Sequence, residues 1–188
     1  TSNGASALPT WQTPASGAGN WIKISSATAS ASATIDFTGL SSTYGSYVVT
    51  ITHLAPATDA TVLWMRTSTD NGAAYDAGAS DYCWYVSSSE IDTSPTALIA
   101  GDDADSQIEL TAPATDTMGN STNEDGAFTV TIYDPTAAFF TRITCIGEYK
   151  TSVPTECICN SGGSRLSAAD VTAIRFLMSS GNIATGEF

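Results

Sequence analysis

Residues 46–69 read SYVVTITHLAPATDATVLWMRTST, and this stretch decides the fold class. Two runs rich in β-branched and aromatic residues, 46–54 and 61–69, flank a short loop that contains Pro56. Such runs favour β-strands, and proline is tolerated between strands but not within their hydrogen-bonded ladders. Because the loop has an ordinary hairpin length, we predict that the two strands pair as antiparallel neighbours.

The alternation of apolar and polar residues recurs on both sides of this stretch. NWIKISS (20–26) places Ile22 and Ile24 on one face, and SASATIDFTGL (30–40) does the same for its apolar residues, which predicts two further strands. The turn signal Asp-Asn-Gly at 70–72 precedes another strand. The remaining strands are predicted at 81–88, 96–100, 106–110, 127–135, 139–149 and 156–160.

Three segments receive other predictions. The polar stretch 111–126 is expected to be a surface loop, and SGGS (161–164) a linker. The chain ends with DVTAIRFLMSSGNIATGEF (170–188), for which a strand is favoured over a short helix. The reason is that two sets of residues alternate along this segment, as residues on the two faces of a strand do. The first set is Val171, Ala173, Arg175 and Leu177, and the second is Thr172, Ile174, Phe176 and Met178.

Composition supports an all-β fold in one main domain. Hydrophobic residues make up 42% of the 188 residues and charged residues only 13%, well below the roughly 25% of an average soluble protein. We predict an extended N-terminal arm or linker over 1–19, which is rich in small and turn-forming residues. Residues 20–188 are predicted to form an antiparallel β-sandwich, with a jelly roll as the leading topology.

Charge and hydropathy narrow the range of partners. The formal net charge of −13 repels nucleic-acid phosphates and anionic lipid head groups, so we expect neither as a partner. No apolar run approaches the roughly 20 residues that span a bilayer, and we expect no membrane insertion.

Catalytic chemistry is sparse in the sequence. His53 is the single histidine; it lacks a serine or cysteine motif to serve, so a structural role is favoured. No Gly-x-Ser-x-Gly, His-Glu-x-x-His or phosphate-binding glycine motif occurs. Asp102, Asp103 and Asp105 could supply a pair of catalytic carboxylates, although acids in turns are usually solvated. We therefore expect that the chain is not an enzyme.

The sequence suggests two ligand sites, and in each case a purely structural role of the same residues is favoured. Asp70, Asp76 and Asp81 could hold Ca²⁺ as a cofactor, since hard cations bind several loop oxygens; the alternative is a plain Asp-Asn-Gly turn. The rings of Trp64, Tyr82 and Trp84 could stack on sugar rings. Burial in the core or in a subunit interface is the favoured interpretation of these aromatic residues.

The cysteines leave the redox state open. Cys157 and Cys159 are too close along one strand face for an ordinary disulfide, and the pair supplies only half of a zinc site. Cys145 is the most plausible disulfide partner for either of them, which would leave the other and Cys83 free. The favoured alternative is a set of buried thiols.

The chain resembles a β-sandwich module that recurs in virion proteins of tailed bacteriophages, such as tail-fibre and appendage proteins. The resemblance covers WIKISSATASASATIDFTGLSSTYGSYVVTITHLAPATDATVLWMRTSTDNGAAYDAGASDYCWY (roughly 20–85) and DVTAIRFLMSSGNIATGEF. The opening TSNGASALPTWQ resembles linkers of phage fibre proteins. The segment 86–169 matches no module, and the resemblance carries no catalytic or ligand-binding residue.

The resemblance implies a structural protein of the virion that assembles with itself, as a homotrimer by analogy with fibres, and with other virion proteins. A tail fibre or receptor-binding appendage is the leading expectation, with host surface glycans as a ligand. A capsid decoration protein or head fibre is the second hypothesis. A secreted carbohydrate-binding module is the third.

Overall fold

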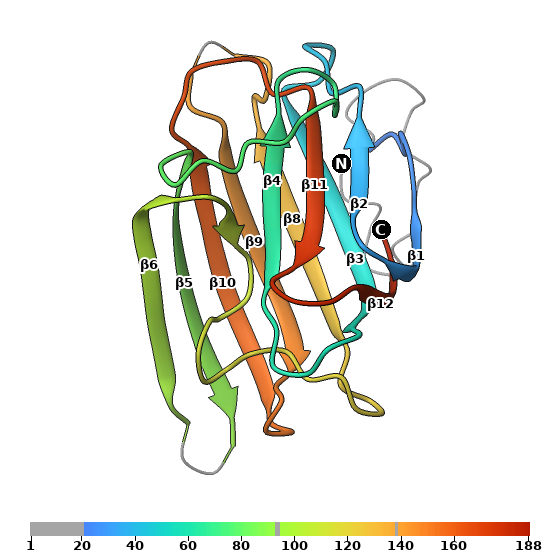
Figure 1. Cartoon of the computed structure of the whole chain (residues 1–188), viewed down its shortest axis with the longest axis vertical. Coiled ribbons are helices and arrows are strands. Elements are labelled where there is room, and N and C mark those ends of the chain that lie inside the picture. The colour runs from blue at the N-terminus through green and yellow to red at the C-terminus, as the bar shows by residue number, and fades with distance from the viewer. Residues whose placement is uncertain (1–20, 93–94, 138) are drawn as a thin grey trace, which may run out of the picture.

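The computed structural model describes residues 21–92, 95–137 and 139–188, and these form twelve β-strands and no helix (Figure 1). The expectation of an all-β fold is therefore confirmed. None of the described residues belongs to a long apolar helix of the kind that crosses a membrane. The strands are β1 (Thr28–Ser32), β2 (Ile35–Thr38), β3 (Ser46–Pro56), β4 (Leu63–Ser68), β5 (Tyr82–Ile91), β6 (Ala97–Asp105), β7 (Ile108–Glu109), β8 (Gly126–Tyr133), β9 (Arg142–Lys150), β10 (Glu156–Arg165), β11 (Ala173–Met178) and β12 (Ile183–Glu187).

The strands form two antiparallel sheets that face each other as a β-sandwich (Figure 1). The larger sheet has the order β1-β12-β3-β8-β9-β10-β5-β6, and the smaller has the order β2-β11-β4-β7. The predicted sandwich is thus confirmed. A jelly roll has eight strands that form two Greek keys. The observed division into one sheet of eight strands and one of four does not establish this topology, so the jelly roll stays a prediction.

The core lies between the sheets because each strand turns alternate residues inward. In β8 and β9 every second residue is buried, among them Phe128, Val130, Ile143 and Cys145. The smaller sheet contributes residues such as Phe176 from β11. Within the part of the chain that the structure describes, the smaller sheet covers one face of the larger sheet, and no second layer covers the opposite face.

The predicted hairpin over 46–69 is wrong, although both of its strands exist. β3 pairs with β8 and β12 in the larger sheet, whereas β4 pairs with β11 and β7 in the smaller one. Ile51 on β3 and Met65 on β4 both point into the core, so the connecting loop carries the chain from one layer to the other. The loop is held by reciprocal backbone hydrogen bonds between Thr61 and Met118.

The first two predicted strands also need correction. Residues 21–27 form no strand, and Ile22 and Ile24 are exposed rather than buried on one face. The predicted strand over 30–40 divides into β1, which pairs with β12, and β2, which pairs with β11. The chain changes sheets between them: Ala31 has a positive φ of 52°, which ends the regular extension of β1. The predicted arm over 1–19 lies outside the described residues.

The segments predicted as a surface loop and a linker are both partly structural. Met118 in the predicted loop is fully buried and bridges Thr61 and Thr151, so this segment helps to close the core. The residues 161–164 continue β10, between β9 and β5. Glycine is required there: a Cβ atom at Gly163 would collide with the carbonyl oxygen of Cys83 on the next strand.

The strands expected later in the chain are confirmed with shifted ends. The preference for a strand over a helix near the C-terminus holds, since β11 lies between β2 and β4 in the smaller sheet. Its residues Ile174, Phe176 and Met178 face the core, and Arg175 and Leu177 face outward.

Candidate functional site

The strongest candidate site lies where β5 and β6 extend past β7 at the edge of the sandwich. Trp84 belongs to the inward-facing row of β5, after the fully buried Tyr82, and continues that row to the border of the core. Its indole Nε1 donates a hydrogen bond of 2.7 Å to a carboxylate oxygen of Asp105 on β6. The bond leaves the half-buried ring fixed at the rim of the larger sheet.

A chain of polar contacts extends from Asp105 toward the smaller sheet. The other carboxylate oxygen of Asp105 accepts hydrogen bonds from the amide side chain of Gln107 (2.8 Å) and from the backbone N–H of Ser106 (2.6 Å). The Arg66 guanidinium on β4 donates to the Gln107 side chain and to the Ser106 carbonyl. Because every one of these groups has a partner, the network fixes the position of Asp105.

Glu109 lies near this network, on β7, where it pairs directly with Trp64 on β4 and senses the charge of Asp105. Its side chain is 8% exposed. Burial raises the pKa of Glu109 to about 7, the negative charge of Asp105 adds to the rise, and the indole of Trp64 partly offsets it. Trp64 Nε1 and Glu109 Oε2 are both buried, and no hydrogen bond of ordinary geometry reaches either atom within the described residues. The site therefore holds a buried carboxyl group whose pKa is raised toward neutral pH.

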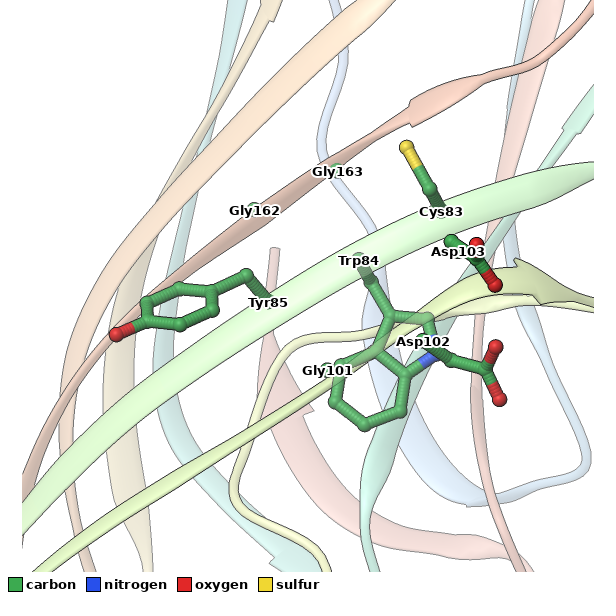
Figure 2. A pocket seen from close by; sticks show the side chains of 8 residues that line it. All are labelled: Cys83, Trp84, Tyr85, Gly101, Asp102, Asp103, Gly162 and Gly163. Carbon is green, nitrogen blue, oxygen red and sulfur yellow. The ribbon is translucent and has the colours of Figure 1, made fainter.

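An open hollow of about 620 Å³ adjoins Trp84 (Figure 2). Tyr85 stands between Gly162 and Gly101, which are its direct neighbours on β10 and β6, so no side chain screens its half-exposed ring. The rings of Trp84 and Tyr85 leave β5 in different directions in Figure 2. The hollow therefore offers aromatic surface on more than one side of β5, together with exposed acids. The residues lining it are Cys83, Trp84, Tyr85, Gly101, Asp102, Asp103, Gly162 and Gly163.

This arrangement places aromatic rings and carboxylates around one hollow. Aromatic faces beside carboxylate acceptors match a ligand rich in hydroxyl groups and C–H surfaces, such as a sugar. The predicted acids separate into two kinds: Asp102 and Asp103 are exposed, whereas Asp105 is held by the network. The described residues contain no group of three His, Cys, Asp or Glu side chains placed to hold a metal ion.

Of the three predicted sugar-stacking residues, the structure brings two to this corner. Trp84 contacts Asp105, and Trp64 lies opposite Glu109, so both adjoin the same acidic network although they belong to different sheets. Tyr82 is fully buried, and its hydroxyl accepts a 2.8 Å hydrogen bond from the backbone N–H of Thr67. Burial raises its pKa to about 12. Tyr82 is therefore a core residue and offers no surface for stacking.

The three candidate calcium ligands each have a protein partner. Asp70 accepts hydrogen bonds from Ser68 Oγ and the Ala74 N–H, which lower the pKa of Asp70. Asp76 forms a 2.6 Å ion pair with Arg165, and Asp81 accepts from the backbone N–H of Gly78. The three carboxylates stabilise the loop between β4 and β5. Each binds a different partner, and they do not converge on a common point.

All four cysteines are free thiols in the structure. Cys145, Cys157 and Cys159 are buried on the inner face of the larger sheet, and burial raises the pKa of all three thiols, that of Cys145 to about 12. Across the ladder Cys145 faces Ser161 and Cys159 faces Gly147. The disulfide of Cys145 with Cys157 or Cys159 stays a prediction, and buried thiols stay the alternative to it.

His53 lies outside the candidate site. It has a positive φ of 53° at the irregularity where β3 leaves register with β8, and its Nδ1 lies 2.9 Å from Asp125 Oδ2. The side chain is exposed, and within the described residues it has no neighbouring nucleophile among its hydrogen-bond partners.

Sequence reasoning missed Glu109 and the two glycines that flank Tyr85. Glu109 stands between Ile108 and Leu110, an alternation that indicates an outward-facing residue, and nothing in it shows that Trp64 covers the outward side. A glycine on each side of Tyr85 becomes visible only once the strand register is known. No protein-family model, curated protein or solved structure matches the chain.

Proposed function

We propose that the chain is a non-enzymatic structural module of a tailed-phage particle, in a tail fibre or receptor-binding appendage, that assembles with other copies and other virion proteins. The phage context rests on the resemblance of the sequence. The observation that carries an assembly role is the outer face of the larger sheet, which no second layer of the described chain covers.

That outer face combines hydroxyl groups with unusually exposed apolar side chains. Directly paired residues share a face, so the pairing of Ile146 with Asn160 and of Ile99 with Ser87 places all four on the outer surface. Ile99 is 68% exposed and Ile146 is 61% exposed. On a soluble protein, a contiguous exposed apolar patch usually marks an interaction site. The exposed large apolar residues of this face are Tyr85, Ile91, Ile99, Tyr133, Ile146 and Ile158.

This role is tested by measuring the oligomeric state of variants in which residues of this face are replaced. We expect the triple variant Ile99→Ser, Ile146→Ser and Ile158→Ser to reduce self-association in light scattering coupled to size exclusion, with an unchanged melting temperature. The matched control is Val153→Ser, which removes an equally exposed apolar residue outside the strands. Equal assembly of the triple variant and the control would refute the role of this face.

The position of the protein in the phage particle distinguishes a tail protein from a capsid protein. Gold or Fab labelling of intact virions, viewed by electron cryomicroscopy, should mark the tail end. Labels distributed over the head would favour the alternative of a capsid decoration protein or head fibre.

A second candidate function, binding of a host surface glycan, is favoured by the hollow beside Trp84 and Tyr85. Glycan-array binding should be lost in Tyr85→Ala and weakened in Asp102→Asn, both of which alter exposed side chains. The control Tyr133→Ala removes an exposed tyrosine from the same face but away from the hollow. Retained binding in Tyr85→Ala would remove the hollow as a glycan site.

A further inference from the structure

One half of β3 has a partner on one side only. On its β8 side the strand is paired from Ser46 onward. On its other side β12 begins to cover it only at Thr52 and continues to Pro56. Within the described residues, no backbone hydrogen bond reaches 46–51 from that side. Within the described residues, every second residue of this six-residue stretch therefore presents open hydrogen-bonding groups, which is the requirement for adding a strand.

The chain also contains a six-residue segment that has strand character but no strand partner. Trp21, Ile22 and Ile24 are 81%, 63% and 60% exposed. The ladder of β1 with β12 reaches back to Ala27, which exchanges two backbone hydrogen bonds with Phe188, and no backbone pairing is present for 21–26 within the described residues. The apolar alternation that predicts a strand here is thus unsatisfied within the described residues.

We propose that the segment 21–26 of one copy adds as an antiparallel strand to the open side of 46–51 in a second copy of this chain. The lengths agree: at roughly 3.3 Å per residue, six residues on each side make a ladder of about 20 Å. The strand exchange is independent of the phage context and uses a different surface from the outer face of the larger sheet.

The pattern of side chains fits this exchange. Tyr47 and Val49 on β3 face inward and are only half-buried at the margin of the core. A strand that places Ile22 and Ile24 on the same face covers them, and the alternation then turns Lys23 to solvent.

The experiment combines oligomeric state with residue-resolved hydrogen exchange on the full chain. We expect the wild type to be oligomeric, with slow exchange at those amides of 46–51 that do not bond to β8. Ile24→Asp should lose this protection while β8 stays protected, and it should form a smaller assembly than the wild type. Ser25→Asp adds the same charge to the opposite face of the segment and should behave like the wild type.

Three results would overturn the proposal. They are a monomeric wild type, an assembly of unchanged size in Ile24→Asp, and protection of 46–51 that Ile24→Asp leaves unchanged. The triple variant of the outer face serves as a separate control, because it should leave the protection of 46–51 in place even if it disrupts other contacts. Failure of the strand exchange and failure of the proposed structural function are therefore distinguishable.

Discussion

At the scale of single residues, Glu109 makes the stability of the fold depend on pH. Its pKa of about 7 in the folded protein lies above the ordinary 4.5, because burial penalises the charged form. A raised folded-state pKa means that the stabilising contribution is complete below about pH 4.5 and is lost as the pH rises through about 7. The loss is on the order of 3 kcal/mol, because a tenfold change in a proton-binding constant corresponds to about 1.4 kcal/mol.

Glu109→Gln should remove this dependence, since the amide stays neutral. Chemical denaturation at pH 5 and pH 8 should show a larger loss of unfolding free energy for the wild type than for the variant. Glu148→Gln, on an exposed residue of β9, is the matched control. An identical pH dependence in the wild type and Glu109→Gln would mean that Glu109 is charged in the folded state throughout this range.

The buried thiols give a second prediction at this scale. Because Cys145, Cys157 and Cys159 are buried and have raised pKa values, they should resist alkylation in the native protein. Denaturation without reductant should then expose four reactive thiols, counted by intact mass. A count of two would instead reveal the disulfide between Cys145 and one member of the Cys157 and Cys159 pair.

At the scale of elements, the sequence predicts most strands but not their partners. Periodicity locates β3, β4, β5, β8, β9 and β11 because each has one buried face. It does not tell whether Ile51 and Met65 reach the core from the same sheet or from opposite sheets, since both arrangements bury the same residues. Of the candidate site, the sequence predicts Trp64, Trp84 and the acids Asp102, Asp103 and Asp105. It does not predict Glu109, because that residue acquires its role from the covering indole.

The glycines of β10 show the same limit and allow a test. Their composition indicates a linker, but the sheet needs them where neighbouring backbones approach closely. Gly163→Ala should destabilise the protein by about 1–3 kcal/mol, as an overpacked core site does, because the new Cβ meets the carbonyl of Cys83. Gly45→Ala is the control, since its Cβ meets only ordinary contact distances. Equal melting temperatures for both variants would contradict the close approach.

At the scale of the whole molecule, the first and last strands are built into the same part of the sandwich. β12 lies between β1 and β3, and β11 lies between β2 and β4. In Figure 1 the early strands and the last strands stand side by side at one flank. The fold is therefore closed by contacts between residues that are far apart in the sequence, for example Phe176 with Ile35, and such contacts form late and slowly during folding.

Removal of 170–188 should consequently prevent folding of the remaining chain. It takes away the strand between β2 and β4 in the smaller sheet, the strand between β1 and β3, and the fully buried Phe176. We expect the truncated chain to lack a cooperative thermal transition and the dispersed amide spectrum of the full chain. A synthetic peptide of 170–188 added during refolding should restore both, whereas a scrambled peptide should not. A truncated chain that still melts cooperatively would show that the larger sheet folds without closure by its C-terminal strands.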